Sequence, residues 1–174
     1  MKRKAKVYID GANIFYTQRK LGWSVDWVKA KIHLTKDYEI IEVRYYTGIK
    51  DHDEKMKRYL EYFDHIGIVA ITKPLKKIRS TSGFIFKSNF DVEMTMDMLL
   101  DRTSTEDIIL FSGDSDFQHL TRKLQTLGKR VIVYSSRKTL SWELKLAADR
   151  YVFLEDIRTE IERIKKPPPE GGVL

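Results

Sequence analysis

The sequence predicts an α/β protein in which helices cover both faces of a mostly parallel sheet. Short apolar stretches of strand length alternate along the chain with longer segments of helical periodicity. Such alternation is typical of parallel sheets, because a chain that returns to pair in the same direction needs a crossover helix. Two of the predicted strands run directly into glycine turns that carry aspartates. Since ligands bind where parallel strands end, we expect the functional site at that edge.

Strands are predicted where short runs rich in β-branched and aromatic residues lie between polar turns. In chain order these runs are residues 5–9, 40–47, 68–72, 107–111, 130–134 and 151–153. Helices are predicted where apolar residues recur with a period of about 3.6. In chain order these segments are residues 12–20, 25–34, 52–65, 90–101, 115–127, 140–148 and 155–165.

Residues at the ends of several helices support these boundaries. Asp26 is expected to cap the start of the second helix, and Thr139 or Ser141 the start of the 140–148 helix. Gly67 and Gly128 each follow a helical segment, at the position where a left-handed residue closes a helix.

Residues 73–89 interrupt the alternation. Ser80-Thr81-Ser82-Gly83 is turn-like and Phe84-Ile85-Phe86 is too short for a helix, so a loop or a small hairpin is predicted. The segment has basic residues and no acidic one between positions 73 and 87: Lys73, Lys76, Lys77, Arg79 and Lys87. This basic segment is suited to binding the phosphates of a nucleic acid, with Phe84 or Phe86 stacked on one of its bases. The alternative is a hairpin whose phenylalanines face the core and whose lysines are solvated.

Length and composition narrow the class of protein. The 174 residues are expected to form one domain over 1–165, followed by a Pro- and Gly-rich tail over 166–174. The chain has no cysteine, which excludes disulfides, thiolate zinc sites and cysteine nucleophiles. No apolar run approaches the roughly 20 residues that cross a bilayer. Met1-Lys2-Arg3-Lys4 leads into a strand rather than a signal peptide, so we expect a cytoplasmic protein with no membrane partner.

The charge of the chain favours polyanions as partners. The formal net charge is +7 and the pI is about 9.4. Excess lysine alone is weak support, but here a basic chain gathers acidic residues at particular turns. That combination is typical of an enzyme that holds a nucleic acid backbone and presents metal ions to one phosphate.

Aspartates follow two of the predicted strands. Asp10 comes directly after the first, and Asp114 and Asp116 follow the 107–111 strand. Because parallel strands end at one edge of the sheet, these side chains are expected to form one acidic pocket. Clustered carboxylates repel one another unless a cation lies between them, and a hard divalent cation prefers oxygen ligands. Taken alone, Asp10 is as consistent with a helix cap as with a metal ligand. One helix needs only one cap, so capping does not explain both Asp114 and Asp116.

Two further aspartates lie on the 90–101 helix. Asp91 falls in its first turn, where the helix dipole favours a carboxylate and where a simple cap is the alternative. Asp97 lies six residues later, about 240° around the helix, on a stripe with Glu93 and Asp101. We expect at most an indirect role for Asp97, behind the direct ligands.

Three segments resemble the signature blocks of NYN-domain proteins, which are PIN-like nucleases. The segments are Tyr8-Ile9-Asp10-Gly11-Ala12-Asn13, Lys87-Ser88-Asn89-Phe90-Asp91-Val92-Glu93 and Ser112-Gly113-Asp114-Ser115-Asp116-Phe117. The chain most resembles the LabA-type bacterial branch, over about residues 5–155, and departs from it at Ser88, where glycine is common. The resemblance implies a three-layer, Rossmann-like fold, a carboxylate cluster that binds one or two Mg²⁺ or Mn²⁺ ions, and endoribonuclease activity in several members.

The resemblance also assigns expected roles. The family's site positions fall on Asp10, Asn13, Asp91, Asp114 and Asp116. We expect the four aspartates to be direct or water-mediated metal ligands, and Asn13 and Ser112 to orient water or phosphate oxygens. Independently of the resemblance, the basic residues expected to contact phosphate are those of the 73–87 segment and those after the 130–134 strand: Lys73, Lys76, Arg79, Lys87, Arg137 and Lys138. The partner is then RNA, or single-stranded nucleic acid more generally. Attack by external water on the phosphodiester leaves 5′-phosphate and 3′-hydroxyl ends. The sequence is also compatible with a homodimer.

Two other enzyme classes and a signalling domain fit the sequence less well. A haloacid-dehalogenase-type enzyme needs a second carboxylate at the position of Ala12, and a receiver-like domain needs an aspartate where the 68–72 strand ends in Thr72-Lys73. Catalysis without metal would need a histidine such as His119. The main alternative is a regulatory or RNA-binding protein of the same fold with little turnover, because some LabA-type proteins are described as regulators and fold alone does not imply activity.

Overall fold

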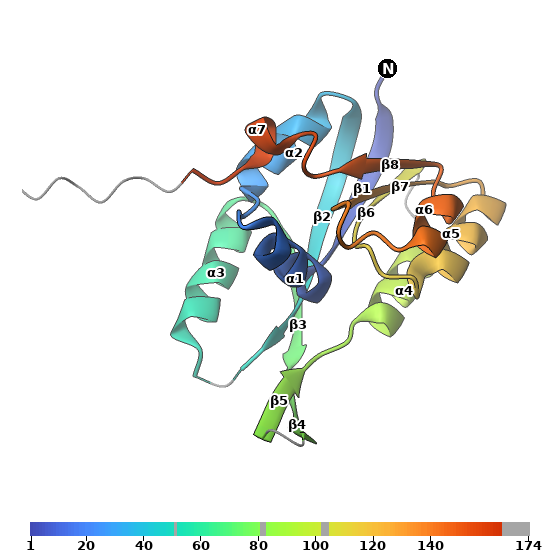
Figure 1. Cartoon of the computed structure of the whole chain (residues 1–174). Coiled ribbons are helices and arrows are strands. Elements are labelled where there is room, and N and C mark those ends of the chain that lie inside the picture. The colour runs from blue at the N-terminus through green and yellow to red at the C-terminus, as the bar shows by residue number, and fades with distance from the viewer. Residues whose placement is uncertain (51, 81–82, 102–104, 165–174) are drawn as a thin grey trace, which may run out of the picture.

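The computed structural model describes residues 1–50, 52–80, 83–101 and 105–164, with the backbone alone for residues 78, 80 and 83–87. A six-stranded parallel sheet in the order β3-β2-β1-β6-β7-β8 forms its centre (Figure 1). The predicted mostly parallel α/β fold is confirmed. The tail predicted over 166–174 lies outside the described residues.

The structure contains each predicted strand and the first six predicted helices with ends shifted by a few residues, and a much shorter last helix. The strands of the sheet are β1 (Arg3–Asp10), β2 (Tyr38–Ile49), β3 (Val69–Pro74), β6 (Asp107–Phe111), β7 (Arg130–Ser135) and β8 (Arg150–Phe153). The helices are α1 (Gly11–Leu21), α2 (Trp27–Thr35), α3 (Glu54–His65), α4 (Asp91–Leu100), α5 (Phe117–Thr126), α6 (Trp142–Ala147) and α7 (Arg158–Ile161). Among the described residues, none of these helices is both long and apolar enough to cross a membrane.

Helices on both faces of the sheet produce three layers. One core contains Ile14 of α1, Trp27 of α2 and Phe63 of α3, packed against alternate residues of the strands such as Val7 and Ile109. The other core packs residues of α4, α5 and α6 against the intervening strand positions: Met94, Met98, Phe117, Leu120, Leu124, Leu144, Tyr8, Ile108, Leu110, Val131 and Val133. Trp23 and Trp27 belong to the first core, as packing residues rather than surface contacts.

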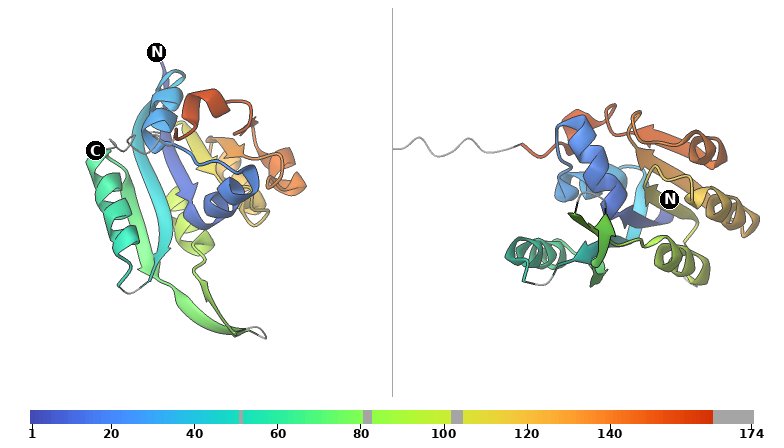
Figure 2. Two further views of the ribbon diagram at one scale, coloured as in Figure 1. Left: turned by 60° about the vertical axis from the view of Figure 1, so that its left-hand side comes forward. Right: turned by 60° about the horizontal axis from the view of Figure 1, so that its bottom comes forward.

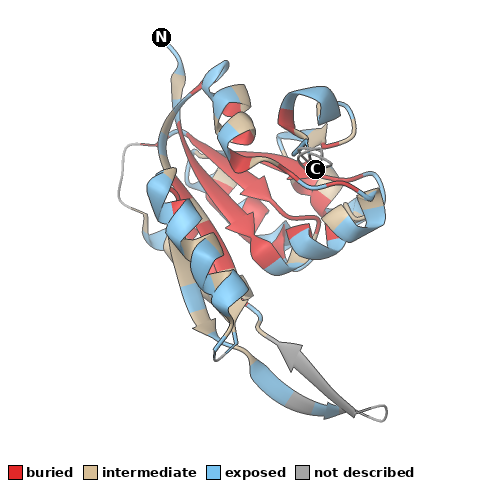
Figure 3. Cartoon of the chain, turned by 90° about the vertical axis from the view of Figure 1, so that its left-hand side faces the viewer, coloured by how far each residue is buried: buried red, intermediate tan, exposed pale blue. Residues whose placement is uncertain are grey.

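Burial on both faces explains why the central strands are mostly apolar. Every residue of β6 is buried, as are all but the first two of β1 (Figure 3). Parallel strands covered on both sides need apolar side chains in both directions. Lys6 is the exception within β1, and its buried ammonium group pairs with Asp101 at 3.0 Å and with Glu42 at 3.2 Å.

The helix caps agree with the sequence. Asp26 accepts hydrogen bonds from the backbone N–H groups of Val28 and Lys29, at 3.0 and 3.1 Å. Ser141, rather than Thr139, caps α6. Gly67 and Gly128 have positive φ angles of 68° and 78°, which is the left-handed conformation expected after a helix.

The last helix is shorter than predicted. A helix over 155–165 is wrong, because α7 ends at Ile161. The chain then becomes extended and bonds to the segment between α1 and α2, with Asp26 N–H donating to Ile161 O and Arg163 N–H donating to Ser24 O, both at 2.8 Å. These bonds take the place of further helical turns and fix the end of the described chain against the first core.

The interval 73–89 contains the predicted hairpin. Strands β4 (Lys76–Ser80) and β5 (Gly83–Lys87) pair antiparallel and form a sheet of their own. The hairpin follows β3 and stands out from the body of the protein (Figure 2). Lys76, Lys77 and Arg79 are exposed on it. The side chains of Phe84, Phe86 and Lys87 lie outside the described residues.

Candidate functional site

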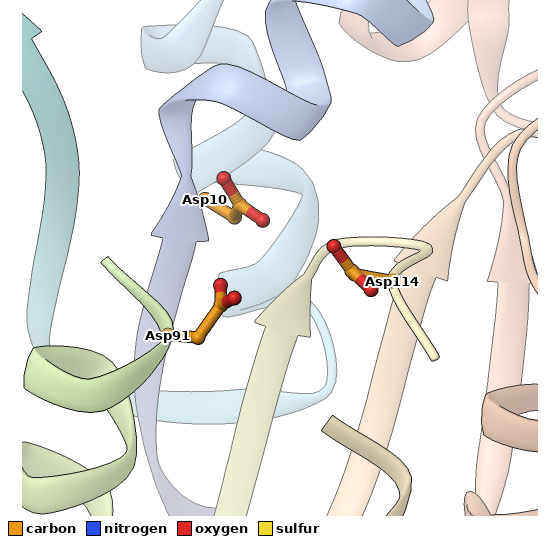
Figure 4. Close-up of side chains that lie close together, drawn as sticks. All are labelled: Asp10, Asp91 and Asp114. Atoms are coloured by element: carbon orange, nitrogen blue, oxygen red, sulfur yellow. The ribbon is translucent and has the colours of Figure 1, made fainter. Parts of the chain in front are cut away.

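Three carboxylates from distant parts of the chain meet where β1 and β6 end. Asp10 is the last residue of β1, Asp91 the first of α4, and Asp114 lies in the turn after β6. One carboxylate oxygen from each lies within 4.8 Å of the others, and the side chains point toward one another (Figure 4). The adjacent pairing of β1 with β6, which brings Ile9 opposite Phe111, places the first and third carboxylates at the same edge.

Asp10 is held in a fixed orientation. Its Oδ1 accepts the backbone N–H of Asn13 at 3.0 Å, and its Oδ2 accepts the Ser112 hydroxyl at 3.0 Å. The residue is 8% exposed. Each carboxylate oxygen keeps a second lone pair, so both remain able to bind a cation.

The turn after β6 carries Asp114 on a short chain of hydrogen bonds. Ser112 Oγ accepts the N–H of Asp114 at 3.2 Å, and Asn13 Oδ1 accepts the N–H of Gly113 at 3.0 Å. Gly113 is required here by close approach, since a Cβ at this position would lie 2.2 Å from the backbone oxygen of Thr139. The start of α1 is thereby tied to the turn that positions Asp114.

Asp91 is positioned through the residues just before it. Asn89 Oδ1 accepts the N–H of Asp91 at 2.7 Å. Phe90 is buried and packs edge-on against Tyr46, with 5.8 Å between ring centroids. Tyr46 pairs with Asp10 across β2 and β1. The same tyrosine therefore lies beside one carboxylate and supports the start of the helix that carries another.

Asp97 anchors α4 from behind. It accepts the Tyr46 hydroxyl at 2.6 Å and pairs with the guanidinium of Arg44 at 3.1 Å. Arg44 also pairs with Glu42 at 2.9 Å. Asp97 thus contacts β2, and it does not belong to the group formed by Asp10, Asp91 and Asp114.

Burial makes the charged form of the cluster costly without a cation. The pKa of Asp10 is raised to about 6, chiefly by burial and further by the charges of Asp91 and Asp114, against the lowering effect of its two hydrogen bonds. The pKa of Asp91 is also raised, first by burial and then by the charges of Asp114 and Asp116. A bound cation would remove both penalties, because it stabilises the ionised carboxylates.

Two other predicted site residues, Asp116 and Ser112, lie next to the three-carboxylate group in the chain. Asp116 is exposed and outside the three-carboxylate group, although its charge acts on Asp91. Its backbone N–H donates to Asp114 Oδ1 at 3.0 Å. Ser112 contacts two of the aspartates, and its hydroxyl proton is used on Asp10.

The basic residues predicted to contact phosphate have internal partners in several cases. Lys73 bonds to the Asn89 carbonyl, pairs with Glu93 at 2.5 Å and lies 4.4 Å from the centre of the Phe90 ring. Arg137 pairs with Asp156 at 2.7 Å. The hairpin side chains of Lys76 and Arg79 are exposed at the surface.

The donor set fits a hard divalent cation. It consists of carboxylate oxygens, with neither sulfur nor imidazole among the described groups, and Mg²⁺ and Mn²⁺ favour oxygen ligands. The hydrogen bonds of Asn13 and Ser112 orient Asp10 in the way that outer partners orient metal ligands.

Asn89 is a cap candidate at the start of this helix from the sequence, but the sequence did not predict how Tyr46 and Arg44 support α4. Tyr46 and Arg44 act through packing, a hydrogen bond and an ion pair between β2 and α4, which a linear pattern does not show. The available signal was the segment Tyr45-Tyr46-Thr47-Gly48 at the end of a predicted strand, which resembles the NYN family.

Comparison with known proteins shows the family and supports the fold. The sequence matches the NYN domain family over residues 4–155, a range that includes all three carboxylates. It is 32% identical over 168 residues to the Low amplitude and bright protein LabA of Synechococcus elongatus, covering 94% of this chain and 90% of that protein. The crystal structure of a protein of unknown function from Vibrio parahaemolyticus superposes with a TM-score of 0.79 at 26% identity, covering 93% of this chain and 97% of the other.

Proposed function

Because the chain belongs to the NYN domain family, we propose that it is a divalent-metal-dependent ribonuclease that hydrolyses RNA phosphodiesters. The observation that carries this proposal is the group formed by Asp10, Asp91 and Asp114 at the ends of β1 and β6. A basic chain with a net charge of +7 supports a polyanionic substrate. The proposed substrate is RNA, within the broader class of single-stranded nucleic acids.

The three clustered aspartates are proposed to hold Mg²⁺ or Mn²⁺, and Asp116 to act through water from its exposed position. A bound ion supplies positive charge to the phosphodiester and makes water a better nucleophile at neutral pH. Ser112 fixes the orientation of Asp10, so that its ionised oxygens face Asp91 and Asp114. Burial of Asp10 keeps bulk water from screening these charges.

Asn13 is proposed to contact the substrate. Its side-chain oxygen is occupied by the N–H of Gly113, which leaves the amide N–H₂ group as a donor for a phosphate oxygen. The exposed cations of the hairpin, Lys76 and Arg79, would bind phosphates of the RNA strand farther from the scissile bond. Attack by external water rather than by a ribose hydroxyl leaves a 5′-phosphate and a 3′-hydroxyl.

The test is cleavage of labelled single-stranded RNA, structured RNA and DNA by the purified protein in Mn²⁺, Mg²⁺ or EDTA. We expect metal-dependent RNA cleavage that is lost in Asp10→Asn and in Asp114→Asn. Asp37→Asn is a matched control, since this exposed aspartate lies just before β2, at the opposite edge of the sheet. Ligation of an adaptor to the products would detect the 5′-phosphate.

Equal cleavage by both active-site variants and the unchanged protein would assign the activity to a contaminant. Tight RNA binding without metal-dependent cleavage would instead favour the alternative, a regulatory or RNA-binding protein that retains the fold.

A further inference from the structure

A second surface, formed by α6 and β8, combines exposed aromatic rings with cations. Trp142 is 65% exposed and Tyr151 41% exposed, whereas Trp23 and Trp27 are 8% and 2% exposed. Phe153 lies beside Tyr151, with 5.2 Å between ring centroids. We call the set of Trp142, Tyr151, Phe153, Lys145 and Arg137 the Trp142 platform.

Lys145 is at the centre of this platform. Its ammonium nitrogen lies 4.9 Å from the centre of the Tyr151 ring, 5.6 Å from that of Phe153 and 5.7 Å from that of Trp142. The described residues include no carboxylate that pairs with it within 4.0 Å. Its charge is therefore available to an anion from outside the chain.

Arg137 closes one side of the platform. Its guanidinium lies 4.4 Å from the centre of the Phe153 ring and pairs with Asp156. With Leu140, four members of the platform line an open pocket of about 390 Å³. The pairing with Asp156 fixes Arg137 against the ring, whereas Lys145 contacts the three rings and has no carboxylate partner among the described residues.

The platform is joined to the carboxylate group by the backbone. Ser141, the residue before Trp142, donates its N–H to the oxygen of Gly113 at 2.9 Å, and Asp114 is the next residue of that turn. Ser141 also caps α6, whose Leu144 is fully buried. Trp142 is thus held at a defined place beside the turn that carries one of the proposed metal ligands.

We propose that the Trp142 platform binds an unpaired base of the RNA, next to the phosphodiester that is cut. This inference rests on the proposed ribonuclease function for the nature of the ligand. An exposed indole offers a flat face on which a base can stack, and a neighbouring ammonium attracts the adjoining phosphate. Binding at this site would favour single-stranded over fully paired RNA, because a base in a duplex is already stacked on its neighbours.

A contact with another protein would use the same surface differently. Leu146, one helical turn after Trp142, is 57% exposed and aliphatic. A protein interface would bury Leu146 together with Trp142, since apolar side chains of both kinds contribute to such contacts. A base stacks on Trp142 and gains little from Leu146, so the two residues separate the alternatives.

The first test is binding of a labelled single-stranded oligouridylate in EDTA, followed by fluorescence anisotropy. We expect Trp142→Ala to weaken binding by about tenfold to a hundredfold, as is typical for loss of one stacked base. Trp142→Phe should retain most of the affinity, and Leu146→Ala should match the unchanged protein. Circular dichroism of each variant would show that the fold is intact.

The second test uses the fluorescence of Trp142 itself. Because Trp23 and Trp27 are buried, iodide should quench mainly Trp142. Saturating oligouridylate should protect it from iodide, and a duplex RNA of the same length should not. Both tests are made without metal, so they give a result whether or not the protein cleaves RNA.

The inference is overturned if Trp142→Ala binds the oligouridylate as the unchanged protein does, or if RNA leaves the iodide quenching unchanged. It is also overturned if Trp142→Ala and Leu146→Ala reduce concentration-dependent self-association equally while RNA binding stays the same. If cleavage fails but Trp142 is protected, the proposed function falls and the binding site stands.

Discussion

Ser112 joins Asp10 to Asp114 through one hydroxyl group. Its O–H donates to Asp10 Oδ2 at 3.0 Å, and its oxygen accepts the backbone N–H of Asp114 at 3.2 Å. The serine is fully buried, so no solvent replaces either bond. Two proposed ligands from β1 and from the turn after β6 are thereby held in a fixed relation before any cation arrives.

The first prediction concerns this serine. Ser112→Ala removes the hydrogen bond to the ionised Asp10 and leaves the Asp114 N–H without its acceptor. Metal affinity should fall by about 10-fold to 100-fold, which is typical when a partner of a metal ligand is lost. Calorimetric titration with Mn²⁺ measures it. Ser135→Ala is the control, because Ser135 is equally buried and bonds to Thr139 rather than to an aspartate. Equal affinity in all three proteins would contradict the prediction.

The second prediction concerns pH. The folded-state pKa of Asp10 is raised from 3.8 to about 6, so the folded chain holds this proton over a pH range in which the unfolded chain has lost it. Metal-free stability should therefore fall as pH rises from about 4 to about 6, and stay level above that range as far as Asp10 is concerned. A shift of about two pKa units corresponds to about 3 kcal/mol of unfolding free energy.

Asp10→Asn isolates this contribution. Urea unfolding in EDTA should show the variant to be more stable than the unchanged protein at pH 7, with the difference vanishing near pH 4. Groups whose pKa values are lowered, such as Glu160 and Asp107, change stability with pH in the opposite sense. Their contributions cancel in the difference between the two proteins, because both proteins contain them. A variant that is less stable at pH 7 would show that the buried charge of Asp10 costs little.

The third prediction concerns the support of α4. Tyr46→Phe keeps the ring that packs on Phe90 and removes the hydroxyl that donates to Asp97 at 2.6 Å. Unfolding free energy should fall by about 1.5–3 kcal/mol, as expected for a hydrogen bond to a charged group. Mn²⁺ affinity should also weaken, because α4 carries Asp91. Tyr16→Phe, at a residue that is 59% exposed, should change neither quantity.

The fourth prediction concerns the hairpin. The double variant Lys76→Ala/Arg79→Ala should weaken RNA binding and reduce the slope of log affinity against log salt by about 1.4, since each phosphate contact to a single strand contributes about 0.7. Metal affinity should stay the same. Lys2→Ala/Lys4→Ala changes the net charge equally at the start of β1, the opposite edge of the sheet, and should leave the slope unaltered. Equal losses in both double variants would indicate a general charge effect.

Sequence periodicity was sufficient to predict the sheet and its helical layers, because buried parallel strands and amphipathic helices impose strong patterns. It failed at the last helix, where 155–165 has suitable periodicity. The backbone after Ile161 instead bonds to Ser24 in a distant part of the chain, and local residue preferences do not report such a partner.

The acidic group was predictable to different degrees. Asp10 and Asp114 follow strands, and the geometry of parallel strands alone predicts that they meet. Asp91 begins a helix, so only the family resemblance placed it with them. Its orientation depends on Phe90 packing against Tyr46, a contact that requires knowing which strand α4 crosses.

Asp10 and Ser112 are 102 residues apart in the chain, yet they touch. A growing polypeptide on the ribosome consequently carries only isolated fragments of the acidic group until Asp114 has emerged and β6 has docked beside β1. On the proposed function, a newly made chain would bind no cation at this site, and would cleave no RNA, until the part of the protein through β6 has folded.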